Sequence, residues 1–265
     1  MSENIFKKIN ELLEKGETFA IVTIVRTEGS TPRKAGAKMI VMPDGGTFGT
    51  IGGDCVEAGA VAEALEALKE GKPKTFTVAL KEEELGGIGM KCGGMVEVYI
   101  EVINPAPRLL IIGGGNIGTQ LAKLGHDVGF AVTVVDPAAK KENFPEYVEV
   151  VPEPVEKGIK MTSITPQTYI VIATGHKYDE DALKAAINTN AAYIGMVGSK
   201  RKAAVTLKKL IEEGMPEEKV KMVHTPVGLD IGAETPEEIA ISIMAEIIKE
   251  RRKPNASGNS LKISI

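Results

Sequence analysis

The sequence predicts an α/β protein made of an N-terminal α+β domain and a C-terminal Rossmann-like domain with a doubly wound parallel sheet. The chain has 265 residues, which is more than one domain usually holds. Two prolines in the segment 104–107 separate a part with hairpin signals from a part where strands and helices alternate. The second part opens with a glycine-rich loop directly after an apolar strand. We therefore expect domains at residues 1–104 and 108–253, followed by a tail at 254–265.

The composition is that of an ordinary globular protein. Hydrophobic residues make up 43% of the chain, charged residues 26%, and the net charge is -4. No basic stripe is present, so we expect no binding to nucleic acid. The start lacks the apolar core of a signal peptide and no later run is long enough to cross a bilayer, which predicts a cytoplasmic protein that does not associate with membranes. Two cysteines are too few for a disulfide framework, which predicts free thiols.

The elements of the first domain follow from residue periodicity. Apolar residues at helical spacing predict a first helix that Gly16 ends, and β-branched runs predict the strands after it. The sequence Pro43-Asp44-Gly45-Gly46 is typical of a hairpin turn. In chain order the patterns predict a helix at 3–15, strands at 19–25 and 37–42, a helix at 55–70, and strands at 74–80 and 95–102.

The second domain alternates between apolar strands and helical patterns, which predicts a parallel sheet. The last helix has the strongest start signal, because Thr235 can cap it, Pro236 suits its first turn and Glu238 can complete a capping box. The predicted strands are 108–112, 130–135, 147–151, 168–173 and 192–196, and the predicted helices are 117–128, 180–187, 202–213 and 235–252.

The glycine-rich loop has the context of a dinucleotide site, because a strand precedes it and a helix follows. Gly113 permits a tight turn, Gly115 and Asn116 bring backbone N–H groups to a phosphate, and Gly118 lets the helix pack closely. Asp136 at the end of the next strand can accept hydrogen bonds from a ribose diol. These residues predict binding of NAD(P). The alternative is a loop that keeps the fold but binds no dinucleotide.

Other motifs resemble a known family, and they occur in that family's order. They are Gly29-Ser30-Thr31-Pro32-Arg33-Lys34-Ala35-Gly36-Ala37-Lys38-Met39, Gly49-Thr50-Ile51-Gly52-Gly53, Thr174-Gly175-His176, Tyr193-Ile194-Gly195-Met196-Val197-Gly198-Ser199-Lys200-Arg201 and Ile231-Gly232-Ala233-Glu234-Thr235-Pro236-Glu237-Glu238-Ile239-Ala240. Together they resemble the XdhC/CoxI family, whose members are accessory and maturation factors for xanthine and carbon monoxide dehydrogenases. The resemblance spans nearly the whole chain and is more specific than the glycine loop.

The resemblance implies a carrier of molybdenum cofactor (molybdopterin) rather than an enzyme, with no catalytic residue. It implies that the chain supports sulfuration of the cofactor with a cysteine desulfurase and inserts the cofactor into a molybdenum hydroxylase of the xanthine dehydrogenase type. It also implies a homodimer. The chain departs from the family's pattern after Gly53, where Asp54 and Cys55 replace a third small residue and leave the local ligand chemistry open.

The first domain supplies hydroxyl, guanidinium and backbone groups for such a ligand. Ser30, Thr31 and Arg33 lie on a loop between two strands, where they can hold a phosphate or the pterin. Gly52 and Gly53 add backbone donors before a helix. The alternative is a structural turn in which Arg33 makes a surface ion pair.

The two thiols are further candidates for cofactor contact. Cys55 lies at a predicted helix N-terminus, where the dipole favours the thiolate. Cys92 precedes Gly93, and the resemblance to the family's Cys-Gly-Gly segment makes Cys92 the first candidate for a cofactor, metal or persulfide contact. Each cysteine is alternatively a small buried residue, and the pair lacks metal-ligand spacing.

In the second domain, His176 follows an apolar strand at the sheet edge where ligands bind in doubly wound folds. Ser199, Lys200 and Arg201 follow a glycine at a predicted helix start and can hold an anion. The alternatives are a histidine bound to a backbone carbonyl and a solvated helix cap. For the whole chain, the alternatives to a cofactor carrier are an NAD(P)-dependent oxidoreductase and a dimeric interaction scaffold without bound cofactor.

Overall fold

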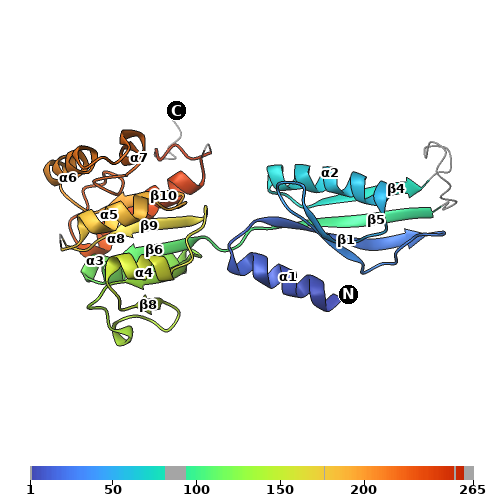
Figure 1. The fold of residues 1–265 in the computed structure, drawn as a ribbon, viewed down its shortest axis with the longest axis horizontal. Coiled ribbons are helices and arrows are strands. Elements are labelled where there is room, and N and C mark those ends of the chain that lie inside the picture. The colour runs from blue at the N-terminus through green and yellow to red at the C-terminus, as the bar shows by residue number, and fades with distance from the viewer. Residues whose placement is uncertain (1, 81–93, 176, 254, 260–265) are drawn as a thin grey trace, which may run out of the picture. The chain divides into compact units, whose positions relative to one another are not determined.

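The computed structural model describes residues 2–80, 94–175, 177–253 and 255–259 (Figure 1). The chain divides into two compact units, Met1–Pro105 and Ala106–Ile265. Each unit has one sheet. Among the described helices, none combines the length and the apolar character that crossing a bilayer requires.

The N-terminal unit is built on a five-stranded sheet of order β3-β2-β1-β5-β4 in which every neighbouring pair is antiparallel. Its elements are α1 (Ser2–Glu14), β1 (Phe19–Glu28), β2 (Lys38–Val41), β3 (Thr47–Gly49), α2 (Asp54–Glu70), β4 (Lys74–Leu80) and β5 (Gly94–Ile103). The predicted hairpin turn joins β2 to β3.

Helices cover the two faces of this sheet, with α2 and α1 on opposite sides (Figure 1). Successive strand residues point to opposite faces. Ala20 and Val22 of β1 therefore pack with the alanines of α2, whereas Phe19 and Ile40 pack with Ile5 of α1. The sheet is consequently buried from both sides over β1 and β2.

The C-terminal unit has a five-stranded parallel sheet of order β10-β9-β6-β7-β8. From central β6 the chain runs outward through β7 and β8, then returns to β9 and β10, which confirms the predicted doubly wound Rossmann-like sheet. Its elements are β6 (Arg108–Ile112), α3 (Asn116–Asp127), β7 (Ala131–Val135), η1 (Lys141–Asn143), β8 (Glu149–Val151), α4 (Val155–Met161), β9 (Thr168–Ile172), α5 (Asp179–Ile187), β10 (Tyr193–Met196), α6 (Lys200–Glu212), α7 (Glu217–Lys221) and α8 (Pro236–Arg251).

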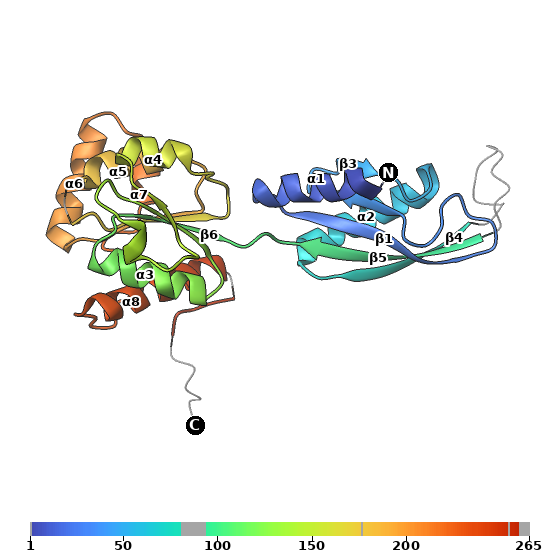
Figure 2. The ribbon, with the colours of Figure 1, turned by 90° about the horizontal axis from the view of Figure 1, so that it is seen from below.

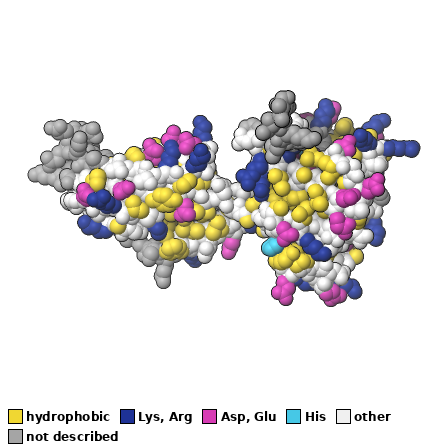
Figure 3. Space-filling model, turned by 180° about the vertical axis from the view of Figure 1, so that it is seen from behind, with side chains coloured by type: hydrophobic (Ala, Val, Ile, Leu, Met, Phe, Trp, Pro, Cys, Tyr) yellow, Lys and Arg dark blue, Asp and Glu magenta, His cyan; other side chains and the backbone are white. Residues whose placement is uncertain are grey.

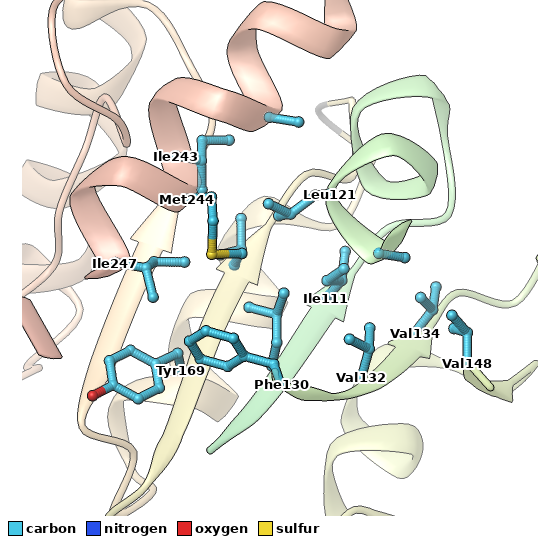
Figure 4. Close-up of a cluster of buried hydrophobic side chains, with 14 of the residues drawn as sticks. Ile111, Leu121, Phe130, Val132, Val134, Val148, Tyr169, Ile243, Met244 and Ile247 are labelled. Atoms are coloured by element: carbon cyan, nitrogen blue, oxygen red, sulfur yellow. The ribbon is translucent and has the colours of Figure 1, made fainter. Parts of the chain in front are cut away.

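Two apolar clusters cover the faces of the parallel sheet. Leu109 and Ile111 of β6 face α3 and α8, as Figure 4 shows for Ile111. Leu110 and Ile112 face the opposite cluster, formed with α4, α5, α6 and α7. Figure 2 shows α3 and α8 on one side of the sheet and α4, α5 and α6 on the other.

Two α-helices of this unit, α4 and α7, were not predicted. Within α4, Gly158 interrupts the helical pattern, because glycine disfavours a helix interior. A Cβ atom at residue 158 would lie 2.3 Å from Cγ1 of Val135, so α4 can pack closely on β7 only with a glycine at this position. The same glycine weakens the helical pattern in the sequence. Helix α7 has five residues and buries only Val220, which is too little periodicity to recognise.

Candidate functional site

A cavity of about 620 Å³ lies at the carboxyl edge of the parallel sheet, where ligands bind in doubly wound folds. Its lining includes the glycine-rich loop after β6, residues 135–139 at the end of β7 and beyond it, residues 173–175 after β9 and Val197 after β10. Tyr178 and Pro236, the first residue of α8, also line it. The sequence-predicted residues Gly113, Gly115, Asn116 and Asp136 therefore share one cavity.

Glycine is present at different positions of this loop for different structural reasons. Gly113 has φ +113°, and a Cβ atom there would lie 2.4 Å from the carbonyl oxygen of Ala173. A Cβ atom at Gly118 would lie 2.0 Å from the carbonyl oxygen of Gly113. Only glycine fits these two positions. Gly115 has open space beside it, so its backbone stays accessible to a ligand.

The carboxylate of Asp136 links the glycine loop to the end of β7. Oδ2 accepts a hydrogen bond from the N–H of Gly114 at 2.7 Å, and Oδ1 accepts one from the N–H of Ala138 at 2.8 Å. Each carboxylate oxygen has a further lone pair. The side chain is thus held in place at the cavity wall while it can still accept hydrogen bonds from a diol.

Helix α3 begins at the cavity with Asn116, and no side chain caps its first turn. The N–H groups of a first helical turn lack partners within the helix, and the helix dipole favours negative charge there. An uncapped helix start beside an accessible glycine backbone is suited to a phosphate or a diphosphate. This arrangement can bind a nucleotide.

Other predicted residues of this unit lie outside the cavity lining. The hydroxyl of Ser199 accepts a hydrogen bond from the N–H of Lys202 at 3.3 Å and caps α6, and Lys200 and Arg201 are exposed in its first turn. The structure thus places Ser199 as a helix cap, which was the alternative interpretation of this segment. His176 lies outside the described residues.

A buried carboxylate that the sequence interpretation missed positions the loop after β9. Asp179 accepts hydrogen bonds from the Thr174 hydroxyl and, at 2.6 Å, from Nζ of Lys202. Thr174 lines the cavity, so this network ties the cavity wall to α6. The available signal was the acidic start of α5, which resembles an ordinary helix N-terminus.

In the N-terminal unit, the segments singled out in the sequence come together at one end of the sheet. A Cβ atom at Gly52 would lie 2.7 Å from Cγ of Pro32, and one at Gly94 would lie 2.4 Å from the carbonyl oxygen of Ser30. Loop 30–33 therefore contacts both loop 50–53 and the start of β5. The hydroxyl of Thr31 donates to the carbonyl of Arg33 at 3.0 Å and closes a local turn.

Of the two candidate thiols, only Cys55 lies within the residues that the structure describes. Cys55 is the second residue of α2, and Asp54 separates it from Gly53, which is the helix N-cap and has open space around it. Cys92 and Gly93 lie outside the described residues, immediately before Gly94 in the sequence. Within the residues that the structure describes, no group of three or more His, Cys, Asp or Glu side chains is arranged to hold a metal ion.

Glu57 organises loop 50–53 and was not singled out in the sequence. Its Oε1 atom accepts hydrogen bonds from the hydroxyl of Thr50 at 2.5 Å and from three backbone N–H groups, those of Ile51, Gly52 and Gly53, at 3.1–3.3 Å. Burial raises the pKa of this carboxyl, but the hydrogen bonds outweigh burial and hold the pKa below its ordinary value. A glutamate in the first turn after two glycines was the available signal.

Figure 3 shows one side of each unit, where charged side chains of both signs lie among exposed hydrophobic side chains.

Comparison with known proteins relates both units to one family. Residues 109–247 match the family described as the XdhC Rossmann domain, and residues 12–79 match the XdhC and CoxI family. The uncharacterized protein YqeB of Escherichia coli (strain K12) is 38% identical over 96% of this chain, which spans 47% of that protein's length.

Two further relatives match along most of their length. One, from Bacillus subtilis (strain 168), bears the name of a probable xanthine dehydrogenase subunit; it is 26% identical, with 94% of this chain and 98% of the relative covered. The molybdenum cofactor insertion chaperone PaoD of Escherichia coli (strain K12) is 25% identical, with 91% of this chain and 86% of the relative covered.

Proposed function

Because the chain belongs to the XdhC and CoxI family, we propose that it binds molybdenum cofactor and inserts it into a molybdenum hydroxylase. The convergence of loops 30–33 and 50–53 with Gly94 is the observation that carries the proposal, since these loops hold the motifs that resemble the family. The similarity to the insertion chaperone PaoD over most of both chains supports it.

The residues at this end of the sheet suit the cofactor's chemistry. Molybdopterin offers a phosphate, a polar pterin and a dithiolene that binds the metal. Gly53 is an N-cap without a side chain and has open space beside it, so the start of α2 has room for a ligand, although the N–H groups of Gly52 and Gly53 themselves already donate to Glu57. Ser30 and Arg33 add a hydroxyl and a guanidinium on the neighbouring loop.

The proposal extends to sulfuration and assembly. We propose Cys92 as the thiol that contacts the cofactor or carries sulfur, with a cysteine desulfurase as the sulfur source and a homodimer as the assembly. The resemblance of Cys92-Gly93-Gly94 to the family's segment supports this role. Cys55, in the first turn of α2, is the second candidate thiol.

Anaerobic titration of the purified chain with molybdenum cofactor tests the proposal. We expect tight binding that Cys92→Ala weakens at least tenfold and that the matched variant Cys55→Ala leaves within about twofold. The loaded chain should then activate a cofactor-free molybdenum hydroxylase. If the wild-type chain binds no cofactor, or binds it without transferring it, the carrier function is wrong.

An NAD(P)-dependent oxidoreductase is the second candidate, favoured by the cavity at the glycine loop and by Asp136. Titration with NAD(H) and NADP(H) separates the two functions. Gly115→Asp is the informative variant, because a side chain fits at this position and its charge would repel a phosphate. Nicotinamide binding without cofactor binding, abolished by this variant, would favour the oxidoreductase.

A further inference from the structure

A second cavity, of about 360 Å³, lies in the N-terminal unit between α1 and the β2–β3 hairpin. Most of its lining comes from the two N-terminal motifs that resemble the family. The motif residues are Arg33, Gly36, Ala37, Lys38, Gly49 and Thr50. The remaining walls are Asn4, Ile5 and Phe6 of α1 and Phe48 of β3.

Backbone register and small residues explain why a cavity exists at this place. Phe48 pairs with Ile40, whose side chain packs with Ile5 on the α1 side of the sheet, so Phe48 is on that side too. Gly49 has φ +91°, and a Cβ atom there would lie 2.9 Å from Cδ1 of Ile5. Gly36 has nothing within 4 Å of its Cβ position. Gly36 therefore leaves open space, whereas Gly49 lets the hairpin approach α1 without a clash.

Two aromatic rings of the lining are only partly covered by protein. Phe6 is 54% exposed and Phe48 is 37% exposed. Large aromatic side chains contribute most to the free energy of binding when their faces are buried against a flat apolar or π surface. A concave site with mostly apolar walls and a few polar groups is the usual form of a small-molecule site.

The polar groups of the lining connect this cavity to loop 50–53. Thr50 lines the cavity and donates to Glu57, whose carboxylate also holds the N–H groups of Gly52 and Gly53. Lys38 is fixed by its hydrogen bond to the Thr23 hydroxyl at 2.8 Å. Asn4 and Arg33 add amide and guanidinium groups of the kind that pair with the edge of a heterocycle.

We propose that this cavity binds the pterin ring system of the cofactor, with Phe6 and Phe48 against its faces and Arg33 and Asn4 at its polar edge. The inference rests on the proposed function and assigns a separate subsite within it.

Titration of the full-length chain with unsubstituted pterin, followed by the quenching of pterin fluorescence, tests the subsite without a hydroxylase. We expect Phe48→Leu and Phe6→Leu each to weaken pterin binding roughly tenfold, because they remove a stacking face but keep apolar volume. Phe48→Tyr should restore binding to within about threefold. Leu13→Ala is the matched control, since Leu13 is 38% exposed on α1 and does not line the cavity.

The outcomes separate this inference from the proposed function. If the wild type binds whole cofactor but no pterin, or if the phenylalanine variants bind pterin like the wild type, the subsite is wrong and the carrier function stands. Pterin binding that depends on both rings, with no binding of whole cofactor, would show a pterin site in this cavity but would contradict both the carrier function and the assignment of the cavity to the cofactor. If the variants change only self-association in sedimentation, the cavity is a contact between two copies and the inference is overturned.

Discussion

At the residue scale, one carboxylate oxygen determines the shape of the loop that joins the two N-terminal sites. Four donors converge on Oε1 of Glu57, three of them backbone N–H groups. Gly52 and Gly53 have no side chains to fix their own conformation, and both have positive φ. The loop therefore depends on a side chain from the following helix.

Replacing Glu57 should weaken the fold by an amount that depends on the acceptor that remains. We expect Glu57→Ala to lower the free energy of unfolding by about 2 kcal/mol, because several donors lose their partner together. Glu57→Gln keeps a carbonyl oxygen and should cost about half as much. Urea unfolding measures the loss of stability for both variants. Glu63→Ala is the control, because the Glu63 carboxylate makes only a 3.8 Å ion pair with Lys74 at the surface. Equal midpoints for Glu57→Ala and the control would contradict this role.

The candidate site could be predicted best where backbone geometry restricts the residue type. Gly113 and Gly118 are recognisable because only glycine fits beside the neighbouring backbone. Glu57 and Asp179 were missed because their partners are backbone groups and side chains that only folding brings together. Ser199 shows the converse, since a hydroxyl at a helix start serves equally as a cap or as a ligand contact.

At the element scale, a polar cluster joins β10, α8 and the segment before α8. Glu246 of α8 accepts hydrogen bonds from the Tyr193 hydroxyl at 2.7 Å and the Gly228 N–H at 2.7 Å, and it lies 3.1 Å from Nδ1 of His224. Burial raises the pKa of Glu246, but these hydrogen bonds outweigh burial and lower the pKa to about 2. The pKa of the Tyr193 hydroxyl is raised, first by burial and then by Glu246.

This cluster should make the stability of the C-terminal unit sensitive to acid. The folded-state pKa of Glu246 is below its ordinary value of 4.5. Glu246 therefore stabilises the folded state fully above pH 4.5, and this stabilisation is lost as the pH falls toward 2. The loss is on the order of 3 kcal/mol for a shift of this size. Urea unfolding across this range should show a shallower pH dependence for Glu246→Gln than for the wild type.

The control is Glu237→Gln, an exposed residue at the start of the same helix. It should unfold with the pH dependence of the wild type. A wild-type slope that Glu246→Gln leaves unchanged would show that other carboxylates cause the acid sensitivity.

Elements could be predicted where one periodicity runs without interruption. The apolar run of β6 and the capping signals of α8 placed both elements within one residue of their observed bounds. Helix α4 was not predicted from the sequence, because its packing on Val135 requires a glycine at residue 158 and glycine has low helix propensity. The strand order of the N-terminal sheet was not predictable, because β1 pairs with β5 through contacts that leave no local signal.

At the scale of the whole molecule, the two units have separate cores. Every described residue of the two N-terminal clusters lies at or before Ile103, and every one of the two C-terminal clusters lies at or after Leu109. Each unit also has its own sheet. A unit of about 100 residues with helices on both faces of a sheet buries enough apolar surface to fold alone.

We therefore expect fragments 1–105 and 106–265 to fold independently. Each should give a dispersed amide spectrum in NMR and a cooperative thermal transition. A fragment ending at residue 92 is the control, because it lacks β5, which pairs with both β1 and β4. Poorly dispersed spectra for both units, against a folded full chain, would show that each unit requires the other.

The pairing of β1 with β5 has a consequence for the chain during its synthesis. Phe19 is opposite Ile103, whereas in the C-terminal sheet Arg108 is opposite Ala131. At a ribosomal rate of about 5–20 residues per second, β1 waits roughly 4–17 seconds for β5, its second partner strand, to be made. During this time β1 can pair only with β2, and its other edge stays open, so the N-terminal half of the nascent chain exposes an unpaired strand edge. The parallel sheet begins to pair almost as soon as its first two strands leave the exit tunnel.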